Sequence, residues 1–276
     1  MDWQQLAYIC WKIRWRLALP IIVALSATNF WAAWAWQLLL FHFTQRLLPL
    51  GEAIRLYFIG QALGSVTPMN VGNDLYRLRA TGARGGRIGA EVATIVMQRF
   101  TSAQALLILG GLAACLAPLS VGIKYTLFIP VAVLLALSIL ILWLASMGKA
   151  RLLRKIGLSD IPGTRLWKAA GLGIALAFAL HLNGVVLAAF LVSAAGIPIP
   201  FVPAVAAILL ARLSILLPFT VHGLGVTEGA LAFFFSRFGA TAEGGLTVGL
   251  LLRLQSLLTG IIGAVLLWQK DHALKP

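Results

Sequence analysis

Acidic side chains are scarce in this sequence. Its 276 residues contain 8 Asp and Glu against 22 Lys and Arg, a formal net charge of +14. In a soluble protein this excess would indicate nucleic-acid binding. Charged residues of both signs make up only 11% of the chain, however, against about 25% in soluble domains. The positive charges fall mostly between apolar runs, where cytoplasmic loops and anionic headgroups explain them better, so we expect no nucleic-acid partner.

Motifs for metal binding and for common catalytic chemistry are also missing. The two cysteines, Cys10 and Cys115, have no metal-ligand spacing and do not form a disulfide framework. The four histidines show no such spacing either. No D-x-D motif, Ser-His-Asp set or H-E-x-x-H stretch is visible. We therefore expect no metal, no cofactor and no catalytic residue, and an enzyme is the less favoured interpretation.

Long apolar runs dominate what remains. Hydrophobic residues make up 61% of the chain, and the mean hydropathy is +0.94. The runs are continuous rather than alternating, which favours membrane helices over a transmembrane β-barrel. We predict one integral membrane domain over residues 1–276, an all-α polytopic bundle with about eight membrane segments. Five are clear, at about 17–40, 92–118, 124–147, 168–193 and 245–268. Three are short or interrupted, at about 56–74, 200–217 and 222–239.

Two basic clusters orient these segments. One lies at residues 77–87 and the other at 149–168, whereas the loop near 194–202 has no charge. The positive-inside rule makes both clusters cytoplasmic. If all eight segments cross, both termini lie inside, and we prefer this arrangement. In the alternative, residues 56–74 and 200–239 form re-entrant hairpins from opposite faces, and the N-terminus lies outside.

Two of the weak segments contain similar helix-breaking sequences. The first, TPMNVGNDLYR, has Pro68, Gly72 and Asp74, with Arg77 as the nearest partner of the aspartate. The second, LLPFTVHGLGVTEGA, repeats the order proline, glycine and acid less regularly, with Pro218, Gly223, Gly225 and Glu228. The freed backbone groups must be buried in protein or line a wet cavity. A pair of interrupted segments in the two halves of a chain indicates a transporter's binding site and a weak, inverted internal repeat.

Ionisable residues also occur inside the apolar runs. Burying them unpaired would be costly, so we expect the acids Asp74, Glu91 and Glu228 to pair with arginines. The arginines are more numerous: Arg77, Arg99, Arg212 and Arg253. A central cavity with spare guanidinium groups would suit a phosphate-bearing headgroup. The alternative is that these pairs only fix the register of the helices. The candidate substrate-binding set is Pro68, Gly72, Asp74, Arg77, Arg99, Arg212, Pro218, Gly223, Gly225, Glu228 and Arg253.

At the two broken stretches the chain resembles the lysylphosphatidylglycerol synthase transmembrane-region family. The family pattern L-P-G-x-x-G-G-D-x-x-R is matched by Pro68, Gly72, Asp74 and Arg77, with Met69 and Asn73 in place of glycines. The pattern L-P-x-S-x-G-G-L-G-x-x-E-G is matched by Leu217, Pro218, Gly223, Leu224, Gly225, Glu228 and Gly229, with Thr220 for Ser and His222 for Gly. In the element E-R-x-x-D, Arg99 remains, while Gln98 and Ser102 replace the acids. Arg253 fits an arginine of the last helix.

The resemblance spans about residues 35–268 and implies a role with membrane lipids or lipid-linked sugars. We predict a flippase- or scramblase-like translocator for an anionic phospholipid or lipid-linked headgroup. The alternatives are a membrane enzyme or a non-catalytic partner subunit in polyprenyl-, hopanoid- or glycolipid biosynthesis. The expected location is the plasma (inner) membrane, as a multi-pass protein. Membrane lipids are the expected partners, and the further candidates are a homodimer or a lipid-synthase partner.

Overall fold

Helices account for all regular structure in the part of the chain that the computed structural model describes, residues 3–82, 88–117, 121–147, 163–216 and 223–273. This confirms the predicted all-α membrane bundle. The five clear segments correspond to five long helices, α2 (Trp15–Thr44), α5 (Ile88–Leu116), α6 (Val121–Ser146), α8 (Gly163–Ala194) and α11 (Ala242–Ala273). Four of them, all except α6, contain a stretch long and apolar enough to cross a membrane. In α6 the apolar helix found is the shorter Phe128–Leu144.

The three weak segments form shorter elements. The first is the sequence α3 (Leu50–Ser65), η1 (Pro68–Asn70) and α4 (Val71–Gly82). The other two are α9 (Phe201–Arg212), followed by η2 (Leu213–Leu216), and α10 (Val226–Arg237). Helices of 12 to 16 residues are about 18–24 Å long, less than the roughly 30 Å of a hydrocarbon core. The count of eight crossing segments is therefore not confirmed.

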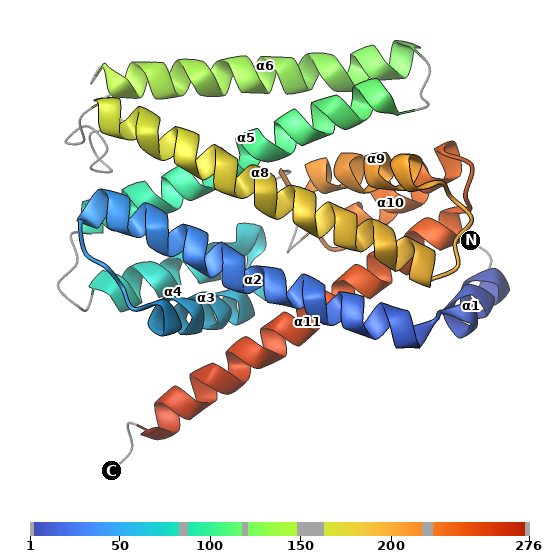
Figure 1. The fold of residues 1–276 in the computed structure, drawn as a ribbon, viewed down its shortest axis with the longest axis horizontal. Coiled ribbons are helices and arrows are strands. Elements are labelled where there is room, and N and C mark those ends of the chain that lie inside the picture. Colours follow the sequence, from blue (N-terminus) through green and yellow to red (C-terminus); the bar gives the residue numbers. More distant parts are fainter. Residues whose placement is uncertain (1–2, 83–87, 118–120, 148–162, 217–222, 274–276) are drawn as a thin grey trace.

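Each group of short helices forms a hairpin instead. Helix α3 packs on α4, and α9 packs on α10. We call residues 50–82 the first hairpin and residues 201–237 the second, with the latter described only over 201–216 and 223–237. The first hairpin lies at the left of Figure 1 and the second at the right, so they enter the bundle from opposite ends of the long helices.

The two halves of the bundle have the same element order in opposite directions. The first half is long helix α2, a hairpin, and long helix α5, and the second is α8, a hairpin, and α11. In Figure 1, α2 runs from right to left and α8 from left to right, while α5 and α11 also run in opposite directions. Helix α6 connects the halves and packs on α5 and α8. This is the arrangement of an inverted repeat.

Helix α11 receives both hairpins along its length. At Gly263 a Cβ would overlap the carbonyl oxygen of Phe58 in α3, and at Gly245 it would overlap that of Leu231 in α10. These glycines allow backbone-to-backbone approach, as small residues do in membrane helix packing. The first hairpin therefore packs on the C-terminal half of α11 and the second hairpin on its N-terminal half, so both breaks lie near its middle.

The placement of the helix ends agrees with the second arrangement considered from the sequence, in which the broken segments are re-entrant hairpins. The ends of α4 and α6 and the starts of α5 and α8, which flank the basic clusters, lie at the same end of the bundle as the C-terminal end of α11. Helix α1 (Trp3–Lys12) lies at the opposite end (Figure 1). This placement agrees with the re-entrant alternative, and the side of the membrane on which each terminus lies stays a prediction. The expectation that both termini share one side depended on counting the short helices as crossings, whereas a hairpin returns to the face from which it entered.

Candidate functional site

The first hairpin turns on two residues with left-handed backbone angles. Met69 has φ 54° and Asn70 has φ 58°, which is uncommon for residues other than glycine. Pro68 begins the 3-10 turn before them. Gly72 follows, where a Cβ would lie only 2.6 Å from the Leu63 carbonyl oxygen of α3. The amide of Gly72 donates a 2.8 Å hydrogen bond to the side chain of Thr67, so the start of α4 is fixed against the end of α3.

Asp74, in the first turn of α4, binds two arginines at once. Its Oδ1 accepts from Nη2 of Arg77 at 2.7 Å, and its Oδ2 forms an ion pair with Arg99 of α5. Arg99 also donates to the carbonyl oxygen of Met69 at 2.8 Å. The aspartate therefore joins the hairpin break to the long helix α5. This is the pairing expected for a carboxylate near hydrocarbon.

Arg77 is held on several sides. Its side chain is 4% exposed, and Nη1 donates to Gln98 at 2.9 Å. The guanidinium lies over the rings of Trp36 and Tyr57, at 4.9 and 5.3 Å from their centroids. Cation–π contacts and a carboxylate together stabilise the buried charge. Gln98, which stands where the resembled family has an acid, supplies a neutral acceptor here.

The second hairpin has a similar arrangement around Glu228 of α10. Gly223 and Gly225 both have left-handed backbone angles, φ 71° and 79°. The amide of Gly225 donates to Oε2 of Glu228 at 2.8 Å, which caps the start of α10. Oε1 accepts from Nη2 and Nε of Arg253 in α11, at 2.6 and 3.0 Å. Pro218, the remaining candidate in this stretch, lies outside the described residues.

The two ion pairs occupy equivalent places in the inverted repeat. Each joins an acid in the first turn of a hairpin helix to an arginine 25 residues later. Arg99 is the twelfth residue of α5, and Arg253 is the twelfth residue of α11. This equal spacing supports the weak repeat seen in the sequence. It also favours the interpretation that these pairs fix the hairpins against the long helices.

Arg212, at the end of α9, has a different environment from the other three arginines. Its guanidinium lies against α8, where a Cβ on Gly184 would be 3.3 Å from both Nη atoms. His181 of α8 lies nearby and shares a 2.9 Å hydrogen bond with Ser102 of α5. Among the described residues, no carboxylate lies within ion-pair distance of Arg212. Of the four candidate arginines, Arg212 is therefore the one for which the described residues supply no ion-pair partner.

Glu91, the third acid inside an apolar run, pairs differently from Asp74 and Glu228. It is buried in α5 and accepts a short hydrogen bond from the hydroxyl of Thr81 in α4. Of the four candidate arginines, none forms an ion pair with it among the described contacts. Its contact with α4 fixes the base of the first hairpin.

A polar pocket lies beside the first hairpin break, and sequence reasoning missed it. It has a volume of about 170 Å³ and is lined by Thr28, Asn29, Gln61, Ser65, Gln255, Ser256 and Thr259. These residues come from α2, α3 and α11, and those of α2 and α11 lie near the middle of their helices. We call it the midspan pocket. None of its seven lining residues is charged, so it is not the guanidinium-lined cavity that the sequence predicted.

Hydrogen bonds connect the midspan pocket to the first break. Gln61 donates to Oδ1 of Asn29 at 3.1 Å and accepts from Asn73 at 3.1 Å. The pairs Gln61 and Ser65, and Gln255 and Thr259, are four residues apart and so share a helix face. Polar residues at this spacing within apolar runs were the available signal. They were overlooked because each is a common neutral residue.

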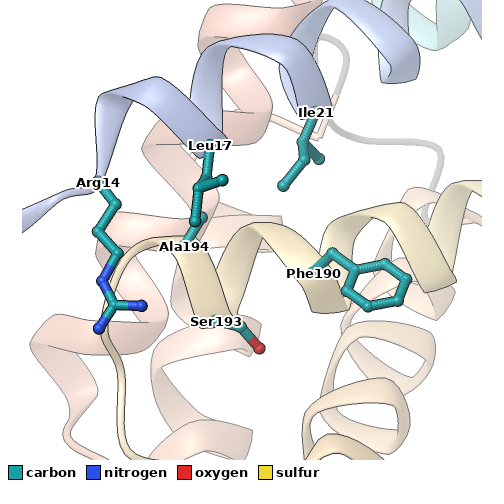
Figure 2. A pocket seen from close by; sticks show the side chains of 6 residues that line it. All are labelled: Arg14, Leu17, Ile21, Phe190, Ser193 and Ala194. Carbon is teal, nitrogen blue, oxygen red and sulfur yellow. The ribbon is translucent and has the colours of Figure 1, made fainter.

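A second pocket is larger and mostly apolar. It has a volume of about 410 Å³ and lies between the start of α2 and the end of α8. Figure 2 shows Leu17 and Ile21 pointing from α2 toward α8, which carries Phe190 and Ser193, with Arg14 at one edge. None of the candidate site residues lines it. Its apolar walls are typical of a lipid-facing groove.

The fold and these contacts define a helical membrane protein with two inverted half-bundles, each carrying a hairpin fixed by an acid–arginine pair. Comparison with protein families matches residues 1–263 to the Lysylphosphatidylglycerol synthase TM region. The chain belongs to this family, as the two broken stretches indicated, and a membrane role connected with lipids follows. Neither the comparison with curated proteins nor that with solved structures returned a match.

Proposed function

We propose that this protein moves an anionic lipid headgroup across the plasma (inner) membrane. The substrate class is an anionic phospholipid or a lipid-linked phosphate. The family supports a role with membrane lipids, and the inverted repeat with two mid-membrane breaks is typical of transporters that expose one site to either side in turn. The candidate contacts are the eleven residues predicted from the sequence, of which Arg212 has the strongest support.

The observation that most supports this proposal is the environment of the Arg212 guanidinium. This group lies at the inner end of a broken helix, against Gly184, without a carboxylate among its described neighbours. An isolated charge in an apolar bundle is expensive unless an anion or water accompanies it. Arginine binds phosphate through two parallel hydrogen bonds, so a phosphate-bearing headgroup is a suitable partner. The other three arginines, by contrast, each form an ion pair with Asp74 or Glu228.

The test is lipid movement in liposomes that contain only the purified chain. Fluorescent phosphatidylglycerol and phosphatidylcholine are placed in the membrane, and the fraction reachable by an external quencher is followed over time. We expect faster movement of the anionic lipid than in empty liposomes. Arg212→Gln should lower that rate at least about tenfold, because one charge-assisted contact is worth roughly 1.5–3 kcal/mol.

Arg237→Gln is the matched control. Arg237 lies at the exposed end of α10, so this variant loses the same charge on the same hairpin away from the break. It should move lipid at the rate of the unchanged protein. Equal rates for Arg212→Gln and the unchanged protein, or no movement above empty liposomes, would contradict the proposal. Formation of a new lipid product in the same assay would favour an enzyme instead.

A further inference from the structure

We infer that the midspan pocket binds an uncharged group rich in hydroxyls, no larger than a single sugar ring. Its volume of about 170 Å³ corresponds to about five or six water molecules. Only the role of this bound group rests on the proposed function: it would be the second part of a headgroup whose phosphate contacts Arg212. The binding itself is independent of lipid movement.

The hydroxyl side chains of the pocket present acceptors rather than donors. Thr28 donates its proton to the Leu25 carbonyl at 2.6 Å, Ser65 to Ala62 at 2.7 Å and Ser256 to Leu252 at 3.2 Å. A backbone carbonyl can only accept, so each of these hydroxyl protons is already used. Their oxygens retain lone pairs, and a ligand that meets them must donate hydrogen bonds.

The amide side chains supply the donors. Gln61 uses one proton of its amide on Asn29, and Gln255 uses one on Thr259 at 3.2 Å. Each side-chain amide has two protons, so one on each glutamine is unused among the contacts of the described residues. Asn29 has no amide proton left, because it donates one to the Ser26 carbonyl and one to Thr259. The pocket therefore offers several acceptors and two donors without a formal charge.

This combination distinguishes among ligand classes. A phosphate or carboxylate only accepts, and it would meet three hydroxyl oxygens that only accept and no cation. An ammonium group only donates, and no carboxylate lines the pocket to neutralise it. A hydroxyl both donates and accepts, so it can satisfy both kinds of group. Because the pocket lies near the middle of α2 and α11, such a group would be held at the depth where transporters bind their substrates.

Gln61 connects the midspan pocket to the first hairpin, so a ligand bound in the pocket would lie next to the hairpin. Its Oε1 accepts from Asn73 at 3.1 Å and from Asn70 at 3.5 Å, and both residues lie at the break. The same side chain therefore contacts the pocket and the turn with the two left-handed residues. A ligand that hydrogen-bonds Gln61 would contact the hairpin tip through a single residue.

The experiment measures binding by native mass spectrometry of the full chain in detergent. Three probes are compared at equal concentration: a glucosyl-diacylglycerol, the diacylglycerol with the same acyl chains, and free methyl glucoside. We expect the glucosyl lipid to bind at least about tenfold more tightly than the bare diacylglycerol, because a site built for hydroxyls rejects the analogue that lacks them. Binding of the free glucoside would identify a soluble sugar as a ligand. Binding of the glucosyl lipid alone would identify a lipid headgroup.

Gln255→Leu removes the remaining donor on α11 and should weaken binding of the glucosyl lipid about tenfold. Ser65→Leu fills the pocket and should abolish that binding, which decides the matter if Gln255→Leu does not fold. Ser138→Ala on α6 is the control, because Ser138 also donates to a carbonyl of its own helix but lies outside the pocket. It should bind normally.

Two results would overturn the inference. They are equal binding of the glucosyl lipid and the diacylglycerol, and unchanged binding of the glucosyl lipid in both pocket variants. Arg212→Gln separates this inference from the proposed function. A protein that still binds the glucosyl lipid but fails to move anionic lipid retains the pocket and loses only the transport proposal.

Discussion

Acid–arginine contacts fix the two hairpins, and their chemistry explains why charged residues are tolerated at the breaks. Glu228 is 8% exposed, and both of its oxygens have donors, Gly225 and Arg253. Asp74 is satisfied in the same way by Arg77 and Arg99. Each carboxylate joins the start of a hairpin helix to a long helix. Loss of one member leaves its partner charged in an apolar bundle, which costs more than the pair contributed.

We expect Glu228→Gln to lower the free energy of unfolding by about 2–3 kcal/mol, since it removes the carboxylate that Arg253 binds. The value lies below that of a fully buried pair because the Arg253 side chain is 21% exposed. Thermal or denaturant unfolding in detergent measures the change. The double variant Glu228→Gln with Arg253→Gln should lose less than the sum of the two single variants. Additive losses would show that the two side chains do not interact.

At the scale of elements, glycine decides where helices can touch. Gly263 and Gly245 let α3 and α10 approach the backbone of α11 from opposite ends. Both positions are otherwise ordinary helix interior, where glycine is less favourable than alanine by about 1 kcal/mol. Their benefit therefore comes from contact between helices. The breaks themselves follow a different rule, because Gly223 and Gly225 have left-handed angles that other residues seldom adopt.

Gly263→Ala is expected to destabilise the protein by about 1–3 kcal/mol, because the new methyl group overlaps the Phe58 carbonyl and separates α3 from α11. The melting temperature in detergent reports this change. Gly171→Ala in α8 is the matched control, since nothing lies within 4 Å of its Cβ position. That variant should be neutral or more stable by up to about 1 kcal/mol. Equal behaviour of the two variants would contradict the close approach of α3 and α11.

For the whole molecule, the hairpins change the orientation of the chain in the membrane. Because each hairpin returns to the face it entered, the long helices alone carry the chain from one side to the other. Helix α1 lies opposite the basic clusters, so by the positive-inside rule we expect it on the outer side. The inverted repeat follows from the same fact, since its two halves insert in opposite directions.

Labelling from outside the cell tests this orientation. In a background with Cys10→Ser and Cys115→Ser, we expect Trp11→Cys to react with a membrane-impermeant maleimide, because Trp11 is 88% exposed on α1. Gln269→Cys near the end of α11 should react only after the membrane is opened. A variant that carries only Cys10→Ser and so keeps Cys115 is the positive control, since either arrangement places Cys115 outside. Protection of position 11 in intact cells would instead support eight crossing segments.

How far the sequence could predict the site depends on the residue. Asp74 and Arg77 are three residues apart and were expected to pair, which the structure shows. Arg99 and Arg253 were recognised as candidates, but their partners lie on other helices and could not be assigned from spacing. The midspan pocket was missed, because Gln61 and Gln255 become neighbours of one cavity only after α3 packs on α11. Contacts between residues close in the sequence follow from their spacing, whereas contacts between distant residues depend on how the helices pack.

The sequence by itself determined that this chain is a helical membrane protein, where its long helices lie and where they break. Apolar length, proline and glycine act locally, so their consequences can be derived residue by residue. Only the tertiary structure decided that the broken segments fold back as hairpins, which arginine lacks a carboxylate, and which neutral side chains enclose a pocket. Those features depend on the distances between helices far apart in the chain, which no local pattern encodes.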